Sequence, residues 1–130
     1  QYDSTRSWLP ENAAIAAEVH RFLSLAAGKI AFGPAAARLV NVFGAGLDHE
    51  NAKSISHAVL AELDAHLAGR EWLAGTTPTI ADVANYAYIA HAPEGDVSLE
   101  DYSNVGAWLS RIEALEGFVP MQATAVGLAA

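Results

Sequence analysis

Apolar residues recur at steps of three and four along most of the chain, the spacing that places them on one face of an α-helix. The first stripe runs from Ile15 to Ile30, after a helix start predicted at Leu9-Pro10-Glu11-Asn12 with Pro in the first turn. Gly33-Pro34 predicts a break or kink, after which the helix continues to Phe43. Strand-like alternation and hairpin turns are absent from the sequence.

Two more segments show the same amphipathic spacing. Asp48 is predicted to cap a helix that ends at Gly69. The apolar face of this helix consists of Ile55, Val59, Leu60, Leu63 and Leu67. A further helix is predicted from Asn104 to Leu115, with Trp108 on its inner face. Because helices of this kind bury their stripes against one another, the pattern predicts an all-α bundle of about five to six helices.

A different pattern marks residues 80–90, which are apolar almost all round. Within the helix predicted there, only Asp82 and Asn85 are strongly polar. A helix without a polar face has to be surrounded by other elements. We therefore predict that this segment is the buried central helix of the bundle, with residues 86–89 away from solvent.

The start of the central helix carries a capping signal. Asp82 follows Thr79 by three residues. This spacing lets the hydroxyl accept a hydrogen bond from the N–H of Asp82, and the carboxylate accept one from the N–H of Thr79. Pro78 and Val83 stand where a hydrophobic staple packs. All four residues are therefore predicted to be structural, because capping explains Asp82 without a catalytic role.

Length and charge narrow the function classes. The 130 residues are 52% hydrophobic, enough for one folded domain. We assign residues 10–121 to this domain, residues 1–9 to a linker and residues 122–130 to a tail. The net charge of −8 disfavours nucleic acid as a partner, because an acidic surface repels phosphate.

The residue types and segments that the sequence lacks exclude further classes of function. We identify no apolar run long enough to span a membrane, so no membrane partner is predicted. The absence of Cys excludes a disulfide, a thiolate metal site and a catalytic Cys within this chain, and it fits a cytoplasmic protein. His57 and His66 are out of phase on a helix and cannot chelate a metal together. The residues alone therefore predict no catalytic residue and no metal site.

Two motifs resemble the C-terminal domain of glutathione transferases. The first is Trp72-Leu73-Ala74-Gly75 followed by Thr77-Pro78-Thr79-Ile80-Ala81-Asp82, which is similar to the family signature W-L-x-G … [ST]-x-A-D. The second covers residues 102–113 and Gly117-Phe118, and it is similar to the family ending Y-P-N-V-x-x-W-L-x-R-I-E-x-x-P-G-F, with Ser103 in place of the first Pro. The resemblance spans residues 8–121.

The resemblance implies a glutathione-transferase C-terminal-like bundle of bacterial type. In that family, an N-terminal thioredoxin-like domain, which this chain lacks, holds most of the co-substrate glutathione and activates its thiol. The full-length protein is then expected to conjugate glutathione to an electrophile without a metal, whereas the isolated chain is expected to be inactive. The helical half is expected to form part of the electrophile pocket and of a homodimer interface.

The resemblance also implies site residues. The electrophile wall is expected at the end of the first long helix, at Ile30, Ala31, Phe32 and Arg38. Ser24 falls where some bacterial members place an Asn that reaches the glutathione of the partner subunit. Members of the beta type use a His from this helix, but the matching region here is Ala31-Phe32. Ordinary helix packing and a plain exposed Ser remain the alternatives for these positions.

A second interpretation keeps the fold and changes the function. Glutathione-transferase-like helical domains also serve as assembly modules in some translation factors and synthetase complexes, beside unrelated domains and without glutathione. The acidic charge is compatible with this role. A thioredoxin-like pattern upstream would support the enzyme, and a different neighbour would support the assembly module. A third interpretation is a generic bundle, which a structure without a Thr79-capped central helix would favour.

Overall fold

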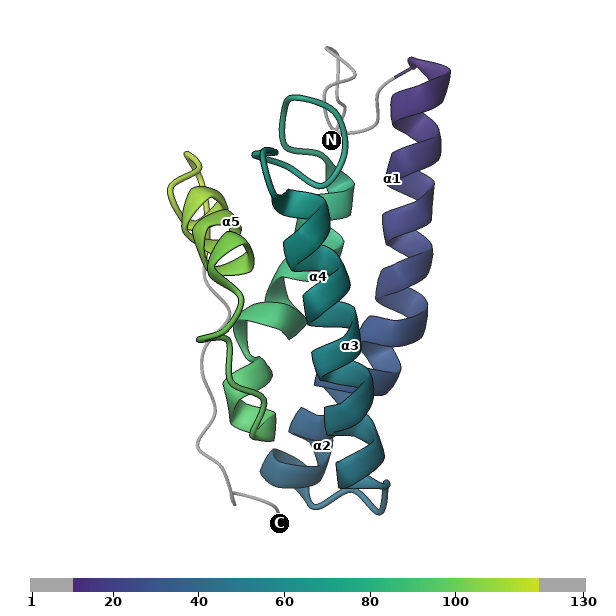
Figure 1. Cartoon of the computed structure of the whole chain (residues 1–130), viewed down its shortest axis with the longest axis vertical. Helices are drawn as coiled ribbons and strands as arrows, with labels where there is room; N and C mark the ends of the chain where they lie inside the picture. The colour runs from purple at the N-terminus through teal and green to yellow at the C-terminus, as the bar shows by residue number, and fades with distance from the viewer. Residues whose placement is uncertain (1–10, 120–130) are drawn as a thin grey trace.

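The computed structural model describes residues 11–119, which form a bundle of helices joined by loops and turns and contain no strand (Figure 1). The predicted all-α class is confirmed for this part of the chain. In order, the elements are α1 (Ala13–Leu25), the π-helical η1 (Ala26–Ala35), α2 (Ala36–Phe43), α3 (His49–Leu67), α4 (Ile80–Ala90), the short 3₁₀ helix η2 (Ala92–Gly95) and α5 (Ser103–Glu113). The predicted linker and tail lie outside the described residues.

The start of α1 differs from its prediction. The helix begins at Ala13, after Glu11, so no acidic residue lies in its first turn. Asn12 is the N-cap, and its Oδ1 accepts hydrogen bonds from the N–H groups of Ala14 at 3.0 Å and Ile15 at 3.2 Å. A short amide side chain reaches two free N–H groups at once, which explains why the helix starts here.

At Gly33-Pro34 the sequence predicted a break or kink and a continuation to Phe43; the break is wrong, and the continuation is confirmed. Both residues lie inside η1, and Ala13–Phe43 is one continuous helix of 31 residues. Gly33 marks a close contact instead, because a Cβ there would lie 3.0 Å from Ile55 Cγ2 and from Ser56 N on α3. A π-helical segment shifts the hydrogen-bond partners by one residue, which accommodates the missing N–H of Pro.

This continuity changes two expectations. The described residues contain four long continuous helices, slightly fewer than the five to six predicted. The joined helix Ala13–Phe43 is also long and apolar enough to cross a membrane by length and composition, a weak criterion that core helices also meet. The sequence pattern hid this run because Gly33-Pro34 was interpreted as a break.

Helix α4 packs against α1 and η1 of the first long helix, and it also contacts α5 and η2. Tyr86 and Ile89 are buried, as predicted, but the helix is not enclosed on all sides. Val83 is 57% exposed, and Tyr88 is also exposed. The prediction of a helix without any wet face is therefore wrong, because the described elements cover only one side of α4. The proposed packing of Val83 on Pro78 stays a prediction.

A single core fills the space around the inner face of α4. Its largest fully buried side chain is Trp108 of α5, followed by Phe22 of α1. The other large buried side chains come from every long helix and from the loops, and they include Ile30, Leu60, Leu63, Leu73, Ile89 and Val105. One contiguous cluster of this kind is what a single domain requires.

Candidate functional site

The buried carboxylate of Asp82 joins three segments of the fold. Its Oδ1 accepts hydrogen bonds from the indole Nε1 of Trp108 at 2.8 Å and from the N–H of Leu73 at 3.0 Å. Its Oδ2 accepts one from the N–H of Thr79 at 2.9 Å. The residue is 1% exposed, so these three donors replace the water it has lost. Asp82 therefore ties the loop before α4, the start of α4 and helix α5 together.

The N-terminus of α4 is closed by a capping box. Thr79 has an extended backbone, its hydroxyl accepts a hydrogen bond from the N–H of Ala81 at 3.2 Å, and the reciprocal bonds between Thr79 and Asp82 are both present. The sequence spacing was sufficient to predict this pair. It contained no signal for the bonds from Trp108 and Leu73, because those residues approach Asp82 only through the tertiary fold.

Replacing Thr79 with Ala is expected to destabilise the chain by about 1–2 kcal/mol, at the upper end of measured caps. The position is fully buried, so water cannot replace the lost hydroxyl. Urea denaturation followed by circular dichroism measures the change. Thr79→Ser is the matched control, because it keeps the hydroxyl, and a loss as large as that of Thr79→Ala would contradict the capping role.

Phe32 forms the most prominent apolar feature of the face shared by η1 and α3. Its side chain is 68% exposed, and it separates two shallow hollows. One hollow of about 320 Å³ lies toward the start of α3 and is lined by Phe32, Ala36, Leu47, Asp48, Asn51, Ala52 and Ile55. The other, of about 510 Å³, is lined by Gly28, Lys29, Phe32, Ile55 and Ala58. We call the first the Leu47 hollow and the second the Ala58 hollow.

The four residues expected to line an electrophile pocket do not converge. Ile30 is fully buried in the core, and Ala31 is half-buried. Phe32 lines both hollows, and none of the other three lines either of them. Arg38 instead pairs with Glu94. Consecutive positions on a helix point in different directions, so a short run such as residues 30–32 cannot line one wall together.

Ser24 lies on α1, and its side chain is exposed. This placement leaves it accessible to another molecule. It also matches the alternative of a plain exposed Ser, so its contact with the glutathione of a partner subunit stays a prediction.

Sequence reasoning missed a charged cluster between α2 and η2. Arg38 Nε donates to Glu94 Oε1 at 2.6 Å, and His91 Nδ1 lies 2.6 Å from Glu94 Oε2. The ring Nε2 of His49 lies 2.9 Å from the carbonyl oxygen of Gly95. These contacts join residues that are far apart in the chain and have no shared motif. They hold η2 against α2. Arg38 therefore has a structural partner, whereas it was expected to be a polar group of the electrophile pocket.

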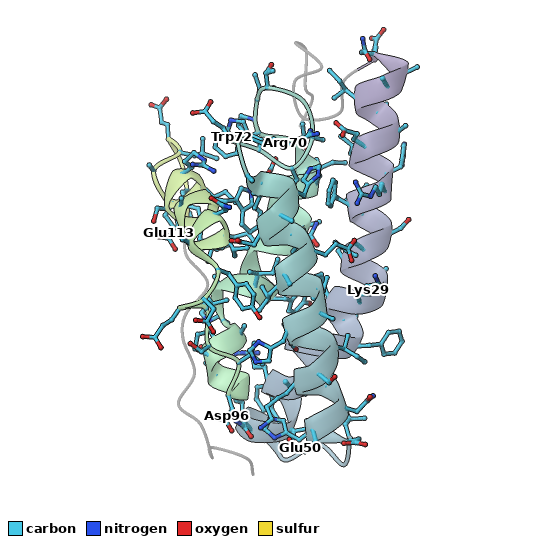
Figure 2. The ribbon with its side chains drawn as sticks, in the orientation of Figure 1. Lys29, Glu50, Arg70, Trp72, Asp96 and Glu113 are labelled. Carbon is cyan, nitrogen blue, oxygen red and sulfur yellow. The ribbon has the colours of Figure 1, made fainter. Side chains whose placement is uncertain are left out.

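A third hollow, of about 390 Å³, lies between α4 and α5. It is lined by Val83, Tyr86, Ala87, Ile112, Leu115, Glu116, Gly117, Phe118 and Val119. The rings of Tyr86 and Phe118 meet edge to face, with their centroids 5.2 Å apart. Tyr86 Oη donates to Glu113 Oε2 at 2.6 Å. In Figure 2, Glu113 lies on the opposite side of the bundle from Lys29, so this hollow is remote from the Phe32 face.

Burial, the hydrogen bond to Glu113 and the charge of Glu113 raise the pKa of Tyr86 to about 12. An unfolded Tyr ionises near pH ~10. The folded pKa is the higher one, so this contribution to stability is complete below pH ~10 and is lost as the pH rises through about 12. An absorbance titration of phenolate should therefore show one step near pH 12 that Tyr86→Phe removes. Tyr88→Phe is the control, and loss of the same step in that variant would contradict the assignment.

The described residues show no constellation for covalent or metal chemistry. Within residues 11–119, no group of three or more His, Asp or Glu side chains is placed to hold a metal ion. His57 contacts the hydroxyl of Tyr102 at 2.8 Å, and His66 Nε2 lies 2.7 Å from the carbonyl oxygen of Leu73. Both side chains therefore have local structural partners.

Comparisons with known proteins agree on one family. The model of the glutathione S-transferase C-terminal domain matches residues 46–116. A glutathione S-transferase of Xanthomonas campestris pv. campestris, GST-4.5, is 36% identical over 66 residues, which are 51% of this chain and 32% of that protein.

Solved structures extend the match over most of the chain. A glutathione S-transferase from Xanthobacter autotrophicus superposes with a TM-score of 0.80 at 30% identity, covering 88% of this chain and 58% of the other. A glutathione transferase from Burkholderia graminis, solved with two glutathione molecules per subunit, gives a TM-score of 0.73 at 26% identity, covering 88% and 52%. The chain thus spans between a third and three fifths of the length of these relatives.

Proposed function

Because the chain belongs to the glutathione transferase family, whose C-terminal domain it represents, we propose that the full-length protein conjugates glutathione to an electrophile. The thiolate of glutathione is the attacking group, since a neutral thiol is a weak nucleophile. An N-terminal thioredoxin-like domain holds glutathione and activates its thiol, so this chain by itself is inactive. The protein acts in the cytoplasm as a homodimer.

The observation that carries this proposal is the junction at Asp82. It connects the two motifs on which the resemblance rests, because Thr79 belongs to the first and Trp108 to the second. A chance match of either motif would not require their side chains to meet at one buried carboxylate. The match of the family model to residues 46–116 covers the same segment.

We place the electrophile wall at the Leu47 hollow. Its volume of about 320 Å³ lies in the range of small-molecule sites, and Phe32, Leu47 and Ile55 give it apolar walls. Asp48 and Asn51 are the polar groups at its edge, a role first expected of Arg38. In the full-length protein, the preceding domain closes this open hollow from outside.

Glutathione is an anionic peptide, so its carboxylates need positive or N–H donor groups. Of the four basic side chains on the first long helix and at the end of α3, Arg21 and Lys29 contact Glu62, Arg38 contacts Glu94 and Arg70 contacts Glu18. This arrangement supports the assignment of most glutathione contacts to the preceding thioredoxin-like domain of the full-length protein. Ser24 adds a hydroxyl contact to the glutathione of the partner subunit.

The test compares the full-length protein with the isolated 130-residue chain. Conjugation of glutathione to an aryl halide is followed by absorbance. We expect turnover by the full-length protein and none by the chain. Turnover by the chain at the rate of the full-length protein would refute this division of labour. A full-length protein that neither binds glutathione nor conjugates any electrophile would support the assembly module instead.

The electrophile wall has its own test. Leu47→Ser is expected to raise the KM for an apolar electrophile by about tenfold, which corresponds to the loss of about 1.4 kcal/mol of apolar contact. Leu39→Ser is the matched control, because Leu39 is also exposed but lines neither hollow. Equal effects of the two variants on KM would show that the Leu47 hollow does not form the electrophile wall.

A further inference from the structure

Asp48 gives the edge of the Leu47 hollow a charge of one sign. Among the residues that line this hollow, Asp48 is the acidic one, and none is basic. Its Oδ1 accepts a hydrogen bond from the N–H of Asn51 at 3.0 Å, and the residue is exposed. A carboxylate has about four acceptor positions, so this one keeps room for a donor on a bound molecule. Asp48 is therefore both the cap of α3 and an accessible acceptor.

The basic residues on either side of Asp48 in the sequence have other partners. Arg38 lies 2.6 Å from Glu94 Oε1, and Lys53 lies 2.9 Å from Glu50 Oε2. The ring of His49 contacts the carbonyl oxygen of Gly95. An anionic molecule that enters the hollow therefore meets the charge of Asp48, and no basic residue lines the hollow to offset it.

The apolar part of the hollow suits an aromatic ring next to a positive group. Leu47 and Ile55 supply aliphatic wall, and the ring of Phe32, which is 68% exposed, lines the same space. The face of an aromatic ring attracts a cation, as a carboxylate does. The amide of Asn51 can donate or accept a hydrogen bond, so it does not distinguish one charge from the other. Charge discrimination in this hollow thus depends on Asp48.

We propose that Asp48 selects the electrophile by its charge. This inference rests on the proposed function, because it concerns the electrophile wall of the full-length protein. The preferred substrate places an aromatic ring in the apolar part of the hollow and a cationic group, or a neutral N–H donor, beside Asp48. A ring that carries a carboxylate or sulfonate in that place is rejected, because two like charges are brought together.

Binding of unreactive ligands tests the charge preference without the reaction. The probes are three nitrobenzenes without a leaving group, which carry a trimethylammonium group, a methyl ester or a carboxylate. Isothermal titration calorimetry with the full-length protein measures their affinities. We expect the cation to bind most tightly and the carboxylate most weakly. The preference should shrink at high salt, because mobile ions screen the charge of an exposed side chain.

Asp48→Asn removes the charge and keeps the cap, because Asn is as good an N-cap as Asp. The affinity for the cation is expected to fall and that for the carboxylate to rise by about threefold each, so that their ratio falls about tenfold. The affinity for the ester should change by less than about twofold. Thermal denaturation checks that α3 remains as stable as in the parent.

Glu50→Gln is the matched control for Asp48→Asn. It removes the same single charge from the first turn of α3, but Glu50 does not line the hollow. Figure 2 shows Glu50 at the lower end of the bundle, where α3 begins. The ratio of the cation and carboxylate affinities should therefore stay near that of the parent. Leu47→Ser is expected to weaken all three probes alike, since it removes apolar wall and leaves the charge of Asp48 in place.

Turnover of matching chloronitrobenzenes judges the proposed function separately. In that reaction the glutathione sulfur bonds to the ring carbon that bears chlorine, and chloride leaves with the electrons of the broken bond. If Asp48→Asn removes the charge preference but no chloronitrobenzene is turned over, the selectivity of the hollow holds and the proposed reaction fails. If the neutral chloronitrobenzene is turned over but Asp48→Asn and Glu50→Gln act equally, or no probe binds, the reaction stands and the inference is overturned.

Discussion

Replacing Asp82 with Ala is expected to destabilise the chain by about 4 kcal/mol. The substitution leaves three buried donors without an acceptor: the indole Nε1 of Trp108 and the N–H groups of Leu73 and Thr79. An orphaned buried donor costs about 1–3 kcal/mol, and the three losses are not fully additive because they share one site. Urea denaturation followed by tryptophan fluorescence measures the change in the free energy of unfolding.

Asp82→Asn is the matched control for this site. The Asn side chain keeps one oxygen for Trp108 and Leu73, but its amide group faces the N–H of Thr79, so one bond is lost. We expect a loss of about 2 kcal/mol, half that of Asp82→Ala. If both variants lost less than about 1 kcal/mol, the hydrogen bonds to this carboxylate would not hold the junction together.

The second large effect is expected at Gly95, where η2 touches α2. A Cβ on this residue would lie 2.6 Å from Arg38 N and 2.7 Å from the carbonyl carbon of Ala37. These are backbone atoms of a packed helix, so they cannot move aside without displacing η2. Gly95→Ala is therefore expected to destabilise the chain by about 3 kcal/mol. The displacement also separates Glu94 from Arg38.

Gly106→Ala is the control for this glycine. Gly106 lies inside α5, and a Cβ there would meet no atom within 4 Å. The helical preference of Ala should make this variant more stable than the parent by about 0.5–1 kcal/mol. Thermal denaturation of the two variants in parallel measures the contrast. A melting temperature for Gly95→Ala equal to that of the parent would show that η2 can move away from α2 without loss of stability.

The elements that the sequence predicted best are those with local signals. Asp48 caps α3 as expected, since its side chain accepts a hydrogen bond from the N–H of Asn51 at 3.0 Å. Gly69 follows the end of α3 with a φ of +76°, the left-handed conformation that suits Gly at such an end. Both signals act within a few residues, so their outcome does not depend on the rest of the fold.

The errors of the sequence interpretation arose where distant segments meet. Gly33-Pro34 was interpreted as a break or kink because local rules assign Gly and Pro to helix ends and bends. In the structure, the close approach of α3 to Gly33 and the π-helical spacing keep the helix continuous. Val83 was expected inside a fully covered helix, but it lies at the open hollow between α4 and α5 and is exposed.

In the candidate site too, local sequence signals identified the residues, and contacts between distant segments decided where their side chains lie. The sequence placed residues 30–32 together on the first long helix, and it also identified Arg38. It did not reveal which of these positions reach the surface. Tertiary packing turned Ile30 into the core, exposed Phe32 and paired Arg38 with Glu94 of η2. The direction of a side chain depends on the local helical spacing, which changed here from α to π.

The sequence by itself determined the helical class, the capped start of α4 and the family, because periodicity, caps and motifs are encoded in neighbouring residues. Only the tertiary structure decided what Asp82 holds together and which face Phe32 presents. Those properties depend on contacts between residues far apart in the chain. A hydrogen bond from Trp108 to Asp82 exists only once α5 has packed against α4, and no spacing along the sequence specifies that approach.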